Sequence, residues 1–392
     1  MSSEDSKKDT KPSKETPKSN KAQETRNLNP APKSHQSLPS IPAAQDDTPK
    51  DANPPPSVQK VIQQIPFQQK HMPIEIPSPA FMQSQQDMPF DFQDLKMGKN
   101  QLLGTEKMKK AYRAATTMSQ KLMEDESPED LKYLREVGDS DVIVIKGCYD
   151  HGQAIFELAG IPYTLVTAQD ISGIDLREDQ IIFVNCPGSD LTTRGLERIR
   201  SFVNNGGLLV TTDWSLKNVL EPAFTGYIRY NGQATADEVV RIVYEPVEDT
   251  FLKGLLDPED TPQWWLEGSS YPIEILKPDQ VTVLVSSKEM GEKYGESPIV
   301  VAFEYGKGKV YHMTSHFYLQ RVETRTARHE QKASAYAAQK GLATSTFGQE
   351  EAEILEEIDV ASVEAAYTSV RSVQNIIVEQ KMRVKNRKKE ST

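Results

Sequence analysis

Cysteine is scarce in this sequence: Cys148 and Cys186 are the only two in 392 residues. Two cysteines are too few for a disulfide framework, so nothing in the sequence indicates an oxidising compartment. No stretch approaches the roughly 18 consecutive apolar residues that a transmembrane helix requires. The N-terminal residues also lack the apolar segment of a secretory signal. We therefore expect a soluble, cytoplasmic protein without a transmembrane segment.

An excess of positive charge is also missing, because the formal net charge is −11 at neutral pH. A general nucleic-acid-binding protein needs a positive surface, so we expect no nucleic-acid partner. Neither G-x-G-x-x-G nor G-x-x-x-x-G-K-[ST] occurs, which removes the usual signs of a nucleotide site. No C-x-x-C pair occurs either. The sequence therefore predicts no cofactor and no metal.

Residues 1–95 have little with which to build a core. Lysine, serine, aspartate, proline and glutamine dominate, and more than half of the 25 prolines lie before residue 90. Such a segment cannot offset the entropy lost on ordering, so we expect a disordered arm. Small apolar groups recur over 58–95. They are interpreted as part of a linker or, alternatively, as short motifs that dock on a protein partner.

Two helical extensions flank the central region. Apolar residues at helical spacing predict a helix over 101–123, and Ser127 followed by Pro128 marks the start of another, which gives a helical extension over 96–137. A C-terminal extension over 326–392 carries an apolar stripe at 361–380 and ends in a basic tail. A stripe of this kind must be covered. We expect the two extensions to dock together, or to pair with a second chain in a homodimer.

The central region, 138–325, alternates strand and helix signals. Residues 142–145, 181–184 and 208–210 are short, nearly continuous apolar runs, which is typical of parallel strands buried on both faces. Helical segments lie between them, so βαβ units follow. Tyr305 to Gly308 join two later apolar runs as a glycine-rich hairpin. The sequence predicts an α/β fold: a flavodoxin-like, mostly parallel sheet with helices on both faces and an antiparallel edge.

Polar residues follow the parallel strands at their carboxyl ends, where open α/β sheets bind ligands. In a flavodoxin-like strand order the strands at 142–145 and 181–184 are neighbours, so the residues after them can converge. Asp150 and His151 could instead cap the following helix. Elsewhere in the chain, we expect the adjacent Trp264 and Trp265 to belong to the core rather than to form a carbohydrate-binding platform. The rim residues are Cys148, Tyr149, Asp150 and His151 after the first run, Asn185, Cys186 and Gly188 after the second, and Asp213 and Trp214 after the third.

Four segments carry a resemblance to a known family: GCYDH, FVNCPG, NNGGLLVTTDWS and YGKGKVYHMTSHFYLQ. In this order they resemble the class I glutamine amidotransferase-like superfamily over about 140–322, and look closest to its trehalose-utilisation-protein-like members. The resemblance implies a flavodoxin-like fold and places His316 at the position of the family's catalytic histidine. The family's nucleophile elbow, G-x-C-x-G, is not matched, because Asp213 stands there and no cysteine does. Tyr318 also replaces the acidic residue that follows the histidine. Glutamine hydrolysis by the family's route is therefore not expected.

Two functions remain open at this point. Because the family nucleophile is missing, we predict a non-catalytic scaffold, or pseudoenzyme, that binds protein partners through 58–95 and 361–380. The alternative is a hydrolase or small-molecule-binding enzyme that uses a thiol, an imidazole and a carboxylate at the rim. Such groups could also form a thiol–imidazole metal site. A cysteine within hydrogen-bond reach of a histidine, inside a pocket, would favour the enzyme. The candidate catalytic residues are Cys148, His151, Cys186, Asp213 and His316.

Overall fold

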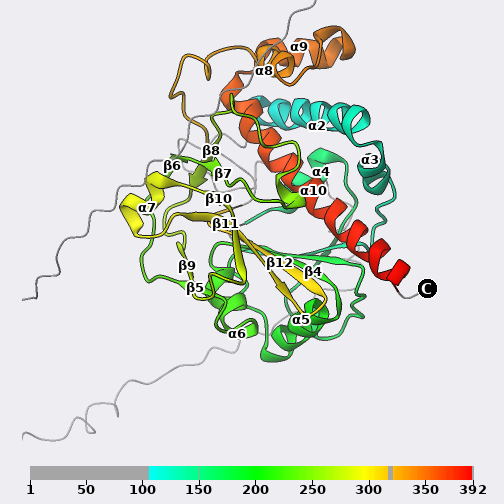
Figure 1. Cartoon of the computed structure of the whole chain (residues 1–392), viewed down its shortest axis with the longest axis vertical. Coiled ribbons are helices and arrows are strands. Elements are labelled where there is room, and N and C mark those ends of the chain that lie inside the picture. The colour runs from blue at the N-terminus through cyan, green and yellow to red at the C-terminus, as the bar shows by residue number, and fades with distance from the viewer. Residues whose placement is uncertain (1–105, 149, 317–320, 391–392) are drawn as a thin grey trace, which may run out of the picture. The chain divides into compact units, whose positions relative to one another are not determined.

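A computed structural model describes residues 106–148, 150–316 and 321–390 of the chain. The predicted arm at 1–95, the docking motifs at 58–95 and Tyr149 lie outside the described residues. An eight-stranded sheet forms the centre of the described part, in the order β2-β1-β3-β4-β12-β11-β10-β7 (Figure 1). Its strands, in that order, are Thr164–Val166, Val142–Ile145, Ile181–Val184, Leu208–Thr212, Gly308–Met313, Pro298–Tyr305, Val281–Ser286 and Val243–Tyr244.

The parallel part of the sheet has the predicted arrangement. β1 pairs in parallel with both β2 and β3, and β4 pairs in parallel with β3 and β12. Every residue of β1, β3 and β4 is buried. This burial is why these strands read as continuous apolar runs rather than as alternating ones. The pairing of β1 with β3 also brings the ends of these two strands side by side, as the flavodoxin-like order requires.

The antiparallel edge is confirmed as well. β11 and β12 pair as a hairpin through Tyr305 and Gly308, and β10 and β7 extend the edge in antiparallel pairing. At Gly308 a Cβ would lie 2.1 Å from the carbonyl oxygen of Val203, so the close approach of two backbones needs glycine there.

The apolar segment 239–244 is divided between two strands. β6 (Glu238–Arg241) leaves the main sheet and pairs with β8 (Gln263–Leu266), while β7 stays at its edge. Between them, the amide of Ile242 donates to the carbonyl of Pro262 at 3.1 Å, so the chain changes partners at this residue. A second small pair, β5 (Ile228–Tyr230) and β9 (Ile273–Ile275), lies outside the main sheet.

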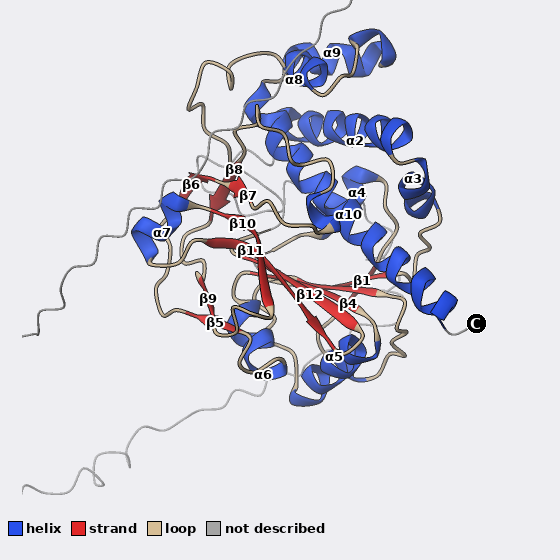
Figure 2. Cartoon of the chain, in the orientation of Figure 1, coloured by secondary structure: helices blue, strands red, loops and turns tan. Residues whose placement is uncertain are grey.

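Helices cover both faces of the sheet, as predicted (Figure 2). Alternate residues of β1 belong to two different cores: Val142 and Val144 pack with the α2, α4 and α10 side, and Ile143 and Ile145 with the α5 side. The helices are α2 (Glu106–Glu126), α3 (Pro128–Arg135), α4 (Gln153–Ala159), α5 (Thr193–Asn205), α6 (Glu221–Ala223), α7 (Lys288–Tyr294), α8 (Ala333–Gln339), α9 (Gln349–Glu357) and α10 (Val360–Glu390).

The N- and C-terminal helices dock on each other, as predicted. α2 and α10 lie side by side over one face of the sheet (Figure 1). The sequence predicted that one apolar stripe of α10 would be covered. In the structure every residue from 360 to 380 is buried, polar ones included. The polar side chains are paired: Arg371 Nε donates to the carbonyl of Lys253 at 3.0 Å, and Asn375 Nδ2 donates to the carbonyl of Phe251 at 2.9 Å.

The basic end of α10 is paired with carboxylates of the same chain. Lys381 Nζ lies 2.6 Å from Asp141, and the Arg383 guanidinium forms a two-pronged ion pair with Glu304 at 2.7 and 2.8 Å. Within the part of the chain that the structure describes, no helix is both long and apolar enough to cross a membrane.

Candidate functional site

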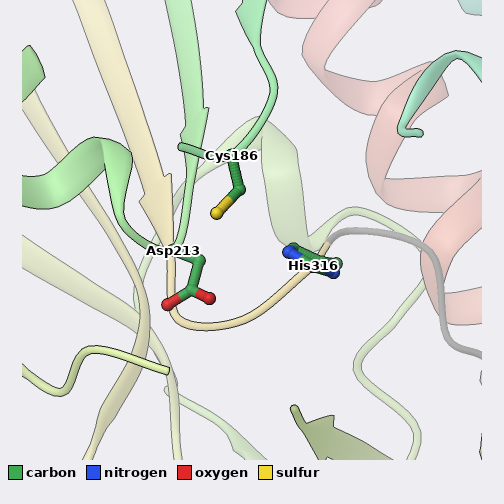
Figure 3. A group of neighbouring side chains, drawn as sticks. All are labelled: Cys186, Asp213 and His316. Carbon is green, nitrogen blue, oxygen red and sulfur yellow. The ribbon is translucent and has the colours of Figure 1, made fainter. Parts of the chain in front are cut away.

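Three neighbouring parallel strands bring a thiol, a carboxylate and an imidazole together. Cys186 follows β3, Asp213 directly follows β4, and His316 follows β12. One donor atom from each residue lies within 4.8 Å of the other two, and all three residues are buried (Figure 3). They meet because parallel neighbouring strands end at the same edge of the sheet. We refer to Cys186, Asp213 and His316 as the rim cluster.

The backbone at the rim cluster is held in an unusual conformation. Asp213 has a φ of 44° and Ser315 a φ of 64°, so two residues with side chains occupy the left-handed region. Such conformations cost about 1–3 kcal/mol each and persist where the surroundings impose them. The amide of Asp213 donates to the carbonyl of Met313 at 2.9 Å, which extends the pairing of β4 with β12 as far as this turn. The chain therefore makes a sharp turn directly after β4, with the Asp213 carboxylate on it.

The Cys186 thiol is buried and neutral. Burial raises the pKa of this thiol to about 11, and the nearby Asp213 carboxylate adds to the rise, although a hydrogen bond with His316 acts in the opposite direction. A thiol with this pKa is almost entirely protonated at neutral pH. Because the thiolate is the nucleophilic form, the protein in this state does not present an activated cysteine.

His316 lies among carboxylates. Burial by itself would lower the pKa of this imidazole, but Asp150, the hydrogen bond with Cys186 and Glu267 raise the pKa well above its ordinary value. Its Nδ1 atom is 2.6 Å from a carboxylate oxygen of Glu267. These neighbours therefore favour the protonated form of the imidazole.

The Asp213 carboxylate is fixed by the loop between β8 and β9. It accepts hydrogen bonds from the amide of Tyr271 at 2.9 Å and from the Ser270 hydroxyl at 3.2 Å. Burial raises the pKa of Asp213 to about 6, and His316 opposes that rise. The loop is itself attached to the rim, since the amide of Glu267 donates to the Ser315 hydroxyl at 2.9 Å.

Glu267, Ser270 and Tyr271 were not among the residues predicted from the sequence. The only signal for them is that the polar run EGSSY directly follows the apolar run QWWL. That run does not reveal its position, because β8 belongs to a separate two-stranded sheet.

Asp150 is buried, interacts electrostatically with His316 of the rim cluster and does not cap a helix. Its Oδ2 atom accepts a hydrogen bond from the Thr212 hydroxyl at 2.5 Å. Its Oδ1 atom is buried and has no hydrogen-bond partner among the described residues. The predicted capping role is wrong, since α4 has Gly152 at its N-cap and no side chain bonded there.

The other predicted rim residues have separate roles. Cys148 is exposed, and although its amide donates to the carbonyl of Cys186 at 3.1 Å, its thiol is not part of the rim cluster. His151 is half-buried, and burial lowers the pKa of its imidazole. The Asn185 side chain accepts from the amide of Gly152 and donates to Gln153 at 2.9 Å, so it holds the start of α4. Gly188 has a φ of 67°, and a Cβ there would lie 2.6 Å from Val219.

Three half-buried aromatic rings stand beside Asp213. Trp214 stacks on Tyr271 with ring centres 5.6 Å apart, and Tyr271 stacks on Tyr230 at 3.8 Å. The Trp214 indole nitrogen donates to the carbonyl of Ser269 at 2.7 Å, which fixes the ring. We call Trp214, Tyr271 and Tyr230 the aromatic wall.

Trp264 and Trp265, in contrast, are both buried, which confirms that they belong to the core and excludes them as a carbohydrate-binding platform.

Two hollows of the described surface lie away from the rim cluster. One, of about 320 Å³, is lined by residues that include Leu176, Phe202 and Lys307. The other, of about 390 Å³, is lined by residues that include Val243, Leu256 and Pro258. Neither contains Cys186, Asp213 or His316, so the hydrogen bond between thiol and imidazole lies in the interior rather than in either hollow.

Comparisons with known proteins found likeness among solved structures. No protein-family model matches the chain, and no curated protein does. A protein from Bacteroides uniformis described as thua-like is 14% identical with a TM-score of 0.34, over 46% of this chain and 84% of that one. A cytoplasmic protein from Salmonella typhimurium is 15% identical with a TM-score of 0.33, over 45% of this chain and 88% of that one.

Larger glycosidases match as well. A beta-galactosidase from Bacillus circulans is 14% identical with a TM-score of 0.32, over 48% of this chain and 31% of that one. This chain thus spans less than a third of the length of that enzyme. With TM-scores of at most 0.34, these matches carry no argument about the fold or the site.

Proposed function

We propose that the chain is an enzyme that hydrolyses a small polar molecule, with the rim cluster as its catalytic centre. The observation that carries this proposal is the convergence of Cys186, Asp213 and His316 from three separate strands, with donor atoms within 4.8 Å of one another. Buried ionisable groups are costly unless paired, and such groups concentrate at functional sites. The left-handed backbone at Asp213 and Ser315 adds a second cost at the same place.

The surroundings of the rim cluster suit a bound molecule. Glu267 contacts His316, Tyr271 contacts Asp213, and both residues are half-buried, as is Trp214 next to Asp213 in the chain. Aromatic rings supply contact area with little loss of side-chain entropy, and a carboxylate orients hydroxyl or amine groups. A small polar molecule with one apolar face would fit this combination.

Cys186 is not the nucleophile in this proposal. Its thiol has a pKa raised to about 11 by burial, and Asp213 stands at the position where the resembled family has its cysteine. A covalent thioester route therefore lacks its reacting group. The enzyme must take its nucleophile from elsewhere, and water is the obvious source in a hydrolysis.

A metabolite-consumption experiment tests the proposal. The full chain and its Asp213→Asn variant are each incubated with a metabolite extract, and mass spectrometry follows which compounds disappear. We expect at least one compound to be consumed about 100-fold faster by the parent protein. Asp175→Asn is the matched control, because Asp175 is exposed. If parent and Asp213→Asn protein consume the same compounds at the same rates, the proposal is wrong.

The scaffold predicted from the sequence is the second candidate. Two observations favour it: no activated thiol directly follows β4, and the hydrogen-bonded Cys186 and His316 line neither of the two hollows described above. The segment 361–380 proposed for partners is buried in the described chain, while 58–95 lies outside the described residues. A scaffold would capture the same proteins from a lysate with or without Asp213, and would consume no metabolite.

A further inference from the structure

We propose that Cys186, Asp213 and His316 bind a divalent transition metal of the zinc class. The proposal deepens the function proposed above, because it names the group that would supply an activated water at the same site. It would also explain why a hydrolase could dispense with an activated thiol. The argument depends on the arrangement of donors, on their chemical type and on the groups behind them.

The donors are close to metal-binding geometry. Tetrahedral zinc has bonds of about 2.0–2.3 Å, which puts neighbouring ligand atoms about 3.5 Å apart. The sulfur, carboxylate oxygen and ring nitrogen lie within 4.8 Å of one another without a metal. A contraction of about 1 Å, which side-chain rotation can supply, would complete the site. The sulfur of Cys186 is turned toward Asp213 (Figure 3).

A carboxylate lies next to one ring nitrogen of His316, as is common for histidines that bind a metal. Its Nδ1 atom lies 2.6 Å from the carboxylate of Glu267. Figure 3 shows one ring nitrogen of His316 on the side of Cys186 and Asp213. A carboxylate on one ring nitrogen and a metal on the other is the usual arrangement of a metal-bound histidine, because the carboxylate fixes the ring and makes it a stronger ligand.

The local charge also favours a cation. Asp150, Asp213 and Glu267 all act electrostatically on or around His316. Asp150 keeps one buried oxygen without a hydrogen-bond partner among the described residues. Burying an acceptor of this kind is unfavourable unless something compensates it. A divalent ion in the rim cluster would compensate the excess of buried negative charge.

The chemical types of the three donor atoms indicate which metal the site would bind. Thiolate and imidazole favour zinc and its neighbours cobalt and nickel, whereas magnesium and calcium prefer sites made of oxygen alone. Three protein ligands leave the fourth tetrahedral position open, which is characteristic of catalytic rather than structural zinc sites. Water at that position would have a pKa lowered toward neutrality.

Cobalt spectroscopy tests this directly and needs no substrate. Metal-free full chain is titrated with Co²⁺, which takes zinc sites and reports a sulfur ligand through a charge-transfer band in the near ultraviolet. We expect one equivalent to bind with this band and to be displaced by Zn²⁺. Cys186→Ser should abolish the band, and Asp213→Asn and His316→Gln should each weaken binding more than tenfold.

Cys148→Ser is the matched control, because Cys148 is the other free cysteine and is exposed. It should keep the whole cobalt spectrum. Circular dichroism and thermal melting of each metal-free variant show whether it has folded, and the titration of the parent protein stands independently of them. If the parent shows no charge-transfer band with stoichiometric Co²⁺, or if the band is lost in Cys148→Ser and kept in Cys186→Ser, the metal site is wrong.

The metal site and the proposed function can fail separately. A cobalt spectrum without consumption of any metabolite would support the metal site and overturn the enzyme. Consumption by chelator-treated protein, at the rate of untreated protein, would support the enzyme and overturn the metal site.

Discussion

Arg371 of α10 donates from Nη1 to the backbone carbonyl of Ser119 in α2 at 3.3 Å, across 252 residues of sequence. This contact lies inside the core that the terminal helices share with the sheet. Arg371 is fully buried, so its hydrogen bonds to backbone carbonyls fix how the two helices meet. The C-terminal helix is therefore part of the core rather than an appendage to it.

Val370→Asp should strongly destabilise the protein. Val370 is fully buried on α10, and an aspartate there would place an unpaired carboxylate in the shared core. We expect a loss of at least about 3 kcal/mol in the free energy of unfolding. The melting temperature should fall by roughly 5–10 °C.

Val243→Asp is the control, since Val243 is 54% exposed. This variant should have a melting temperature within about 2 °C of that of the parent. Equal melting of the parent and Val370→Asp would show that α10 is not packed as described.

His312 should make the protein less stable in mild acid. This residue is buried in β12, with its Nδ1 atom 2.8 Å from the Thr211 hydroxyl. Burial lowers the pKa of His312 to about 3. Between about pH 6.5 and pH 3 the unfolded chain binds a proton that the folded chain does not, so stability falls as the pH falls through this window. From pH 6.5 to pH 5 the loss is about 2 kcal/mol.

Urea unfolding of the parent and His312→Gln at pH 7.5 and pH 5 measures this effect. Glutamine can still bond to Thr211 but does not titrate, so the variant should lose less stability on acidification. The comparison is between the two losses, which removes any general cost of the substitution. A loss of the same size in both proteins would rule out His312 as the titrating group.

Purified protein should release no ammonia from glutamine. Asp213, and no cysteine, directly follows β4, and the Cys186 thiol is neutral because burial raises its pKa to about 11. A coupled ammonia assay measures the release. Glutamine turnover that disappears in Cys186→Ala, but not in Cys148→Ala, would mean that the thiol is activated in a state different from this one.

The two thiols should differ in reactivity toward a disulfide reagent such as Ellman's. Cys148 is exposed, while Cys186 is 1% exposed and has a raised pKa. We expect one thiol to react rapidly in native protein, both to react in denaturant, and none to react rapidly in native Cys148→Ser. Two rapidly reacting thiols in native protein would contradict the burial of Cys186.

Much of the fold could be predicted from local pattern. The apolar runs that became β1, β3 and β4 signal their own burial, and Gly206 after α5 marks the end of that helix. The resemblance then placed His316 at the rim. The change of partners at Ile242 could not be predicted, because both halves of 239–244 read as strand and only the position of β8 decides which half pairs with it.

The sequence alone determined that Cys186 and Asp213 follow buried parallel strands, and strands of that kind end at one edge. It could not determine which cysteine would join His316, because Cys148 and Cys186 follow neighbouring strands and look alike by position. Tertiary structure decided this, by turning the thiol of Cys186 into the interior and leaving that of Cys148 in solvent. It also brought Glu267, Ser270 and Tyr271 onto the rim. Contacts of this kind depend on the packing of a separate small sheet, and no local periodicity in the chain encodes them.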